Sequence, residues 1–122
     1  MYDIYTEEEI ISKVHIETAN AERTRINSCF VVCVLKKLNF MDESIIKEAE
    51  IHAKLDEIID ERFIRVAHQI ARICLKKARN IAQECEKAFA LQVCTTKSIY
   101  VLKKYMNKKK TKEVIETEEK QD

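Results

Sequence analysis

Five cysteines are the side chains whose type and spacing carry the most chemistry in this sequence of 122 residues. Cys29 and Cys33 stand four positions apart, and Cys74, Cys85 and Cys94 follow in the second half of the chain. Cysteines form disulfide bonds, bind metal ions, act as nucleophiles or serve as small buried apolar side chains. The structural elements that carry these five decide among the four uses.

All five cysteines lie in stretches with helical periodicity. On one helix, Cys29 and Cys33 point from the same face and cannot bond to each other without breaking the helix. Cys85 and Cys94 are nine positions apart, which places them about 180° apart around a helix. The last helix can therefore be crosslinked on two sides, to the helix of Cys29 and to that of Cys74. Five free, buried thiols are the alternative interpretation.

Metal-binding and catalytic interpretations find little support in the remaining polar residues. The C-x3-C spacing on a helix lacks the second cysteine or histidine pair of zinc sites. His15, His52 and His68 are scattered along the chain, and no base is indicated beside a cysteine nucleophile. Two acidic pairs lie in charged stretches typical of solvated helix faces: Glu48 with Glu50, and Asp56 with Asp60. We therefore expect no enzyme activity, no cofactor and no bound metal.

The composition excludes several other classes of protein. The sequence contains no glycine and no proline, whereas phosphate loops, dinucleotide fingerprints and nucleophile elbows need glycine because it reaches positive φ. A formal net charge of +1 does not indicate a nucleic-acid-binding surface. The longest apolar run, residues 29–35, is far shorter than the about 20 residues that span a bilayer. We expect neither a nucleic-acid partner nor membrane insertion.

Periodicity and capping residues predict an all-α bundle of about five helices. Thr6 and Glu9 form a capping box at the start of the first helix. Asn39 is expected to end the second helix in the left-handed conformation that glycine normally supplies. No convincing strand is expected. The predicted helices cover about residues 7–18, 22–38, 45–55, 63–78 and 81–105.

We divide the chain into one helical domain of residues 1–106 and a charged, disordered tail of residues 107–122. The tail is a basic block followed by an acidic block, without an apolar stripe long enough to pack. No signal peptide is visible, because polar and acidic residues follow Met1.

The cysteine-containing segments resemble the insect odorant-binding proteins of the pheromone-binding and general odorant-binding type. The resemblance rests on CFVVCVLKKLNFMDE at residues 29–43, on CEKAFALQVC at residues 85–94 and on the position of Cys74 between them. It covers about residues 6–105. It implies a compact, disulfide-linked helical bundle around an apolar cavity, so that residues 1–106 form a ligand-binding domain.

The resemblance also implies how the cysteines pair. It implies bridges from Cys29 to Cys85 and from Cys74 to Cys94. The first family cysteine, and with it the first family helix, has no counterpart in this sequence. Cys33 therefore lacks its family partner and is expected to be a free thiol.

The function implied by the resemblance is that of a secreted, non-enzymatic carrier. Its ligand would be a small hydrophobic molecule such as an odorant, a pheromone or a fatty-acid-like compound, and salivary amine- or lipid-binding relatives share the same features. The residues that we expect to contact the ligand are Ile51, Leu55, Phe63, Val66, Ala67, Ile70, Ala88, Phe89, Gln92, Val93, Tyr100 and Val101. Gln92 and Tyr100 are the expected polar contacts.

Two partners besides the ligand are considered, a chemoreceptor that receives it and a second copy bound through Cys33. The alternative from another class is an intracellular helical scaffold that docks an exposed apolar stripe onto a partner helix. The scaffold predicts reduced thiols and no cavity for a small molecule. The carrier predicts two disulfides and such a cavity.

Overall fold

The computed structural model describes the backbone of residues 3–120 and the side chains of residues 3–107. Five α-helices dominate this part of the chain, together with two short 3-10 helices and one two-stranded hairpin, which confirms the predicted all-α, disulfide-linked bundle. The elements are α1 (Glu7–Ile11), η1 (Val14–Ile16), η2 (Thr18–Asn20), α2 (Ala21–Lys37), β1 (Met41–Asp42), β2 (Ile45–Ile46), α3 (Glu48–Ile58), α4 (Ile64–Arg79) and α5 (Glu84–Lys120).

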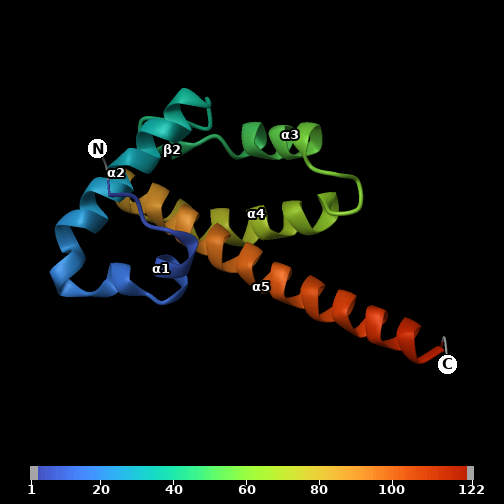
Figure 1. Cartoon of the computed structure of the whole chain (residues 1–122). Helices are drawn as coiled ribbons and strands as arrows, with labels where there is room; N and C mark the ends of the chain where they lie inside the picture. The colour runs from blue at the N-terminus through green and yellow to red at the C-terminus, as the bar shows by residue number, and fades with distance from the viewer. Residues whose placement is uncertain (1–2, 121–122) are drawn as a thin grey trace.

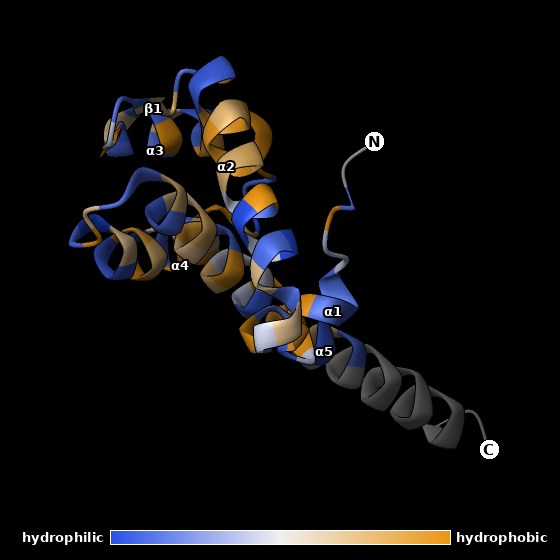
Figure 2. Ribbon diagram, turned by 90° about the vertical axis from the view of Figure 1, so that its left-hand side faces the viewer, coloured by the Kyte–Doolittle hydropathy of each residue, from blue (hydrophilic) through white to orange (hydrophobic). Residues whose placement is uncertain are grey.

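Helix α5 is the element around which the others are arranged. It packs against α2 and α4 and also contacts α1, while α3 packs on α4. Figure 1 shows the orange and red end of α5 extending away from the other helices. Hydrophobic residues recur along α2, α4 and the first half of α5, with charged residues between them (Figure 2).

The first α-helix is shorter than predicted. Thr6 and Glu9 form the expected capping box, but α1 ends at Ile11 because Lys13 takes a left-handed conformation with φ of 66°. Two 3-10 turns follow, and the Asn20 side chain holds them by donating to the carbonyl of Val14 at 2.9 Å. The predicted single helix to about residue 18 is therefore wrong beyond Ile11.

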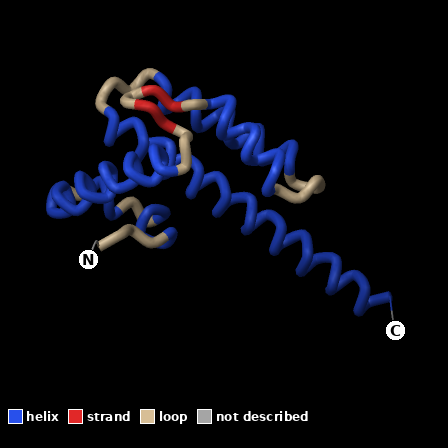
Figure 3. The backbone as a smooth tube through the Cα atoms, turned by 90° about the horizontal axis from the view of Figure 1, so that it is seen from above, coloured by secondary structure: helices blue, strands red, loops and turns tan. Residues whose placement is uncertain are grey.

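The segment after α2 differs most from the prediction. Asn39 has a φ of 64° and ends α2 as expected. The chain then forms an antiparallel hairpin in which Met41 pairs with Ile46, so α3 begins at Glu48 rather than at Ile45. The Lys87 ammonium, from α5, donates to the carbonyl of Ser44 in the turn at 2.5 Å. Figure 3 shows the two strands in red between the end of α2 and the start of α3.

The last helices confirm the prediction except at the ends of α5. Helix α4 lies within one residue of the predicted range. Helix α5 begins at Glu84, where the Gln83 side chain accepts from the Glu86 amide at 2.6 Å. Its backbone is helical to Lys120, so the predicted helix end near Tyr105 is wrong. The division between a ligand-binding domain and a tail at residue 106 remains a prediction, and residues 121–122 lie outside the described residues.

Candidate functional site

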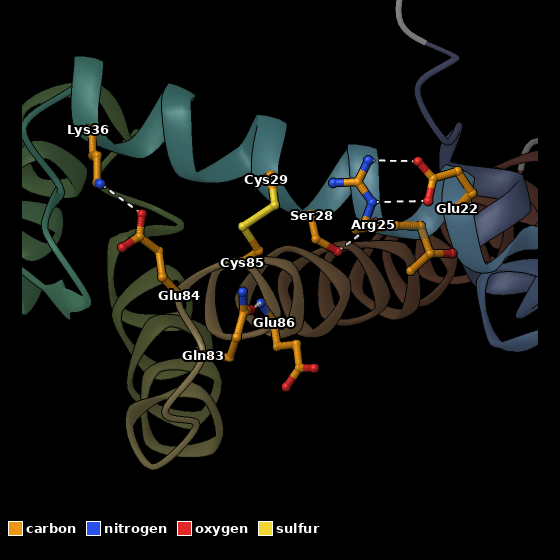
Figure 4. The surroundings of a disulfide bond; sticks show 10 residues. Glu22, Arg25, Ser28, Cys29, Lys36, Gln83, Glu84, Cys85 and Glu86 are labelled. Atoms are coloured by element: carbon orange, nitrogen blue, oxygen red, sulfur yellow. Dashed lines mark hydrogen bonds and ion pairs between the residues drawn. A yellow bond between two sulfur atoms is a disulfide. The ribbon is translucent and has the colours of Figure 1, made fainter.

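Two disulfides connect α5 to its neighbours on opposite sides. Cys29 of α2 is bonded to Cys85, and Cys74 of α4 is bonded to Cys94, as the resemblance implied. Cys33 is a free, exposed thiol. Figure 4 shows α2 crossing the start of α5 at the first bridge, where Lys36 also donates to Glu84 at 2.7 Å. The bonded pairs contradict the interpretation of five free thiols.

A cavity of about 460 Å³ lies between the disulfide-linked helices and α3. Its wall is almost wholly apolar, and its polar side chains are Gln92, Thr95 and Thr96 of α5. The lining residues are Val31, Leu35, Phe40, Ile51, Leu55, Ile59, Phe63, Val66, Ala67, Ile70, Ala71, Leu75, Ala88, Leu91, Gln92, Thr95, Thr96, Ile99 and Leu102. Ligand sites in proteins have similar volumes and a similar excess of apolar lining.

Eight of the twelve predicted ligand contacts line this cavity. They come from three helices and the residues just before α4: Ile51, Leu55, Phe63, Val66, Ala67, Ile70, Ala88 and Gln92. The apolar positions of α3 and α4 recur at helical spacing, and both apolar stripes face the same space. The geometry is therefore that of a ligand site, and their contact with a ligand remains a prediction.

The other four predicted residues do not line the cavity. Phe89 and Val93 pack instead on another side of α5, against Tyr5 and Ile10. Tyr100 lies under the Lys104 ammonium, 5.1 Å from the ring centre. Val101 is 65% exposed. Phe89, Val93 and Tyr100 each follow a lining residue of α5 by one position, which corresponds to a rotation of about 100° around the helix, and this turns them away from the cavity.

Several lining residues were missed by the sequence prediction. On α5, Leu91, Thr95, Ile99 and Leu102 continue the face of Ala88 at steps of three and four residues. Extending that periodicity would have found them. The contribution of α2 was missed for another reason, because the sequence alone does not show which face of this helix meets the cavity. The lining residues from α2 are Val31 and Leu35, and Phe40 follows just after the helix.

Gln92 is the polar group of the cavity that lacks a partner. Its Oε1 atom is buried and accepts no hydrogen bond from the described residues. Thr95, in contrast, donates to the carbonyl of Leu91 at 2.8 Å. A buried acceptor without a donor costs about 1–3 kcal/mol. A hydrogen-bond donor brought by a ligand would remove this cost if the amide turned toward it.

The acidic pairs considered in the sequence do not line the cavity. Glu48 accepts two hydrogen bonds from Arg79, at 2.6 and 2.9 Å, and these bonds lower the pKa of Glu48. Asp60 accepts from the backbone and side chain of Arg62, which lowers its pKa. Asp56 contacts His68 at 2.7 Å. The carboxylates of Glu48, Asp56 and Asp60 thus make contacts with side chains on or beside α4.

The histidines are less scattered than the sequence suggested. His52 and His68 meet between α3 and α4, with a nitrogen–nitrogen distance of 2.6 Å. His15 packs separately against the rings of Tyr5 and Phe89. Among the residues that the structure describes, no three His, Cys, Asp or Glu side chains form a metal-binding group. In the same part of the chain, no helix has both the length and the apolarity of a membrane span.

Comparison with known proteins agrees with this architecture. The model of the PBP/GOBP family matches residues 5–98, which is more than half of the chain and includes all five cysteines. Neither the curated proteins nor the solved structures contain a significant match. Members of this family bind small hydrophobic ligands without catalysis and are typically secreted. The family match, together with the two disulfides and the apolar cavity, shows that the chain belongs to the PBP/GOBP family.

Proposed function

We propose that the chain is a secreted, non-enzymatic carrier that holds one small hydrophobic molecule in the cavity between α2, α3, α4 and α5. The observation that carries the proposal is the apolar wall of this cavity, whose volume is about 460 Å³. Apolar area removed from water contributes about 25 cal/mol per Å². A ligand in this space is therefore bound mainly by burial of its own apolar surface.

The ligand that fits these walls is an odorant, a pheromone or a fatty-acid-like molecule with a small polar group. The polar group is inferred from Gln92, whose buried oxygen accepts no hydrogen bond from the part of the chain that the structure describes. Disulfides are typical of secreted proteins, and the two bridges support secretion. Delivery to a chemoreceptor and a dimer through the exposed Cys33 thiol are further parts of this proposal.

The test is binding of the fluorescent probe N-phenyl-1-naphthylamine, followed by displacement with long-chain alcohols and fatty acids. Ala67 lines the cavity, whereas Ala53 is exposed on α3. We expect Ala67→Phe to fill the cavity and lower probe affinity by about tenfold or more, which corresponds to about 1.4 kcal/mol. The same substitution at the exposed site, Ala53→Phe, is the matched control and leaves affinity unchanged.

Two results would overturn the proposal. One is the absence of saturable probe binding to the folded, oxidised protein. The other is equal probe affinity in the two phenylalanine variants, since binding would then occur outside the cavity. Circular dichroism of each variant verifies that the helices are intact before affinities are compared.

A further inference from the structure

Two histidines that are 16 residues apart meet edge to edge between α3 and α4. Nδ1 of His52 lies 2.6 Å from Nδ1 of His68, the ring centres are 4.8 Å apart and the ring planes differ by 18°. The centre-to-centre distance is about as long as the nitrogen contact plus the two ring radii. The two nitrogens therefore lie close to the line that joins the ring centres. The lone-pair or N–H direction of each Nδ1, which lies in the plane of its ring, points toward the other ring.

A carboxylate fixes the orientation of one ring. Asp56 Oδ1 lies 2.7 Å from Nε2 of His68, so this nitrogen carries a hydrogen and donates it to the carboxylate. In the neutral ring, Nδ1 of His68 then holds a lone pair, which accepts from Nδ1–H of His52. A carboxylate that accepts from the far nitrogen of an imidazole is the usual partner of a metal-binding histidine.

We propose that His52 and His68 bind one transition-metal ion of the kind that prefers imidazole, such as Zn²⁺, through their Nδ1 atoms. Zn²⁺ lies about 2.0–2.1 Å from imidazole nitrogen in tetrahedral geometry, which separates two such nitrogens by about 3.3 Å. The pair must therefore open by about 0.7 Å from its contact of 2.6 Å. On binding, His52 gives its Nδ1 proton to solvent and takes up a proton at Nε2, so that both rings bind the ion as neutral imidazoles. Water completes the coordination.

The two Nδ1 atoms are the protein ligands that we propose, because the neighbouring acidic side chains have other partners. Glu48 stands one helical turn before His52, but both of its oxygens accept from Arg79. Asp56 contacts the far nitrogen of His68, and no third His, Cys, Asp or Glu among the described residues forms a metal-binding group with the pair. A hard cation such as Mg²⁺ prefers oxygen ligands and is not expected to bind here.

An ion bound by the two histidines would connect α3 to α4. Helices α2, α4 and α5 are joined by the disulfides, whereas α3 contains no cysteine. Helix α3 nevertheless supplies Ile51 and Leu55 to the cavity wall, on either side of His52 in the sequence. An ion shared by His52 and His68 would fasten this remaining wall to α4.

Isothermal titration with Zn²⁺ tests the proposal on the oxidised Cys33→Ser protein, in which no free thiol competes for the metal. We expect one ion per chain and a higher melting temperature with Zn²⁺ than with Mg²⁺. His52→Gln and His68→Gln should each abolish this binding, and Asp56→Asn should weaken it about 10–100-fold. Glu57→Gln changes the adjacent acidic residue, which forms an exposed ion pair with Lys54 at 3.3 Å, and should leave affinity unchanged.

A second measurement does not depend on any histidine variant folding. In the Cys33→Ser protein, substoichiometric paramagnetic Cu²⁺ should broaden the NMR signals of the His52 and His68 rings before those of His15. The proposal is overturned if Zn²⁺ does not bind, if binding survives both histidine substitutions, or if broadening begins at His15. The two histidines would then form a hydrogen bond only.

Discussion

The two buried faces of α5 are constructed in opposite ways. Toward the N-terminal region the helix presents Phe89, which packs with Tyr5 and Ile10 in a filled core. Toward α3 and α4 it presents Leu91 and Ile99, which line a cavity of about 460 Å³. We call these the filled face and the hollow face. Stability and ligand binding are thus assigned to different sides of one helix.

Polar contacts hold the N-terminal segment onto α2 and so close the filled face. The buried Asn27 side chain accepts from the Tyr5 amide and donates to the Asp3 carbonyl, both at 2.9 Å. Arg23 donates two hydrogen bonds to Glu9 and lies 4.0 Å from the centre of the Tyr5 ring. These contacts order a segment that contains no cysteine. The hollow face is bounded instead by α2 and α4, which disulfides join to α5, and by α3, which has no cysteine.

The largest expected effect comes from emptying the filled face. Phe89→Ala should lower the free energy of unfolding by about 3–5 kcal/mol, because it removes a buried aromatic ring from close packing. Leu91→Ala, on the hollow face, should cost less than about 2 kcal/mol, because Leu91 is only partly buried and already borders a cavity. Urea unfolding of the two variants measures both values. Equal losses would remove the distinction between the faces.

Breaking the disulfide beside the hollow face should have the next largest effect. Replacing Cys74 and Cys94 together by serine should lower the free energy of unfolding by about 2–4 kcal/mol. Probe affinity should fall as well, since α4 carries much of the cavity wall. Cys33→Ser is the control and should change stability by less than about 0.5 kcal/mol, because this thiol is exposed and unbonded. Unchanged probe affinity in the double variant would mean that the bridge does not maintain the cavity.

Acid should loosen the filled face, with a smaller effect. Burial, and then the charge of Lys97, lower the pKa of His15 below its ordinary 6.5. Hydrogen bonds from Arg23, and then from the Thr6 amide, lower the pKa of Glu9 from 4.5 to about 2. The unfolded chain therefore takes up these protons at higher pH than the folded chain, so stability falls as pH falls. The fall begins below pH 6.5 for His15 and continues from about 4.5 to 2 for Glu9.

Urea unfolding across this pH range tests the assignment with two variants. His15→Gln should flatten the pH dependence of stability above about pH 4.5, and Glu9→Gln should flatten it below that value. A wild-type protein that gains stability between pH 7 and pH 5, relative to His15→Gln, would show that His15 has the opposite effect.

The sequence predicts the helices and most of one cavity wall, but not the two faces of α5. Ala88 and Phe89 are adjacent and both apolar, and only the packing of the N-terminal segment shows that Phe89 faces away from the cavity. The hairpin was missed because its turn uses Glu43 at a φ of 53°, without glycine. The contact of His52 with His68 depends on how α3 returns along α4, which residue spacing does not reveal. The cysteine pairing was predicted from the family resemblance, since helical geometry alone left free thiols open.

The most direct test of the two-face description is to locate a bound ligand on α5. With methyl-labelled protein and saturating N-phenyl-1-naphthylamine, NMR should give intermolecular contacts from the probe to the methyl groups of Leu91 and Ile70. It should give none to Ile10 or Val93, which lie on the filled side. Contacts to Ile10 and Val93 in place of Leu91 and Ile70 would contradict the assignment of ligand binding to the hollow face.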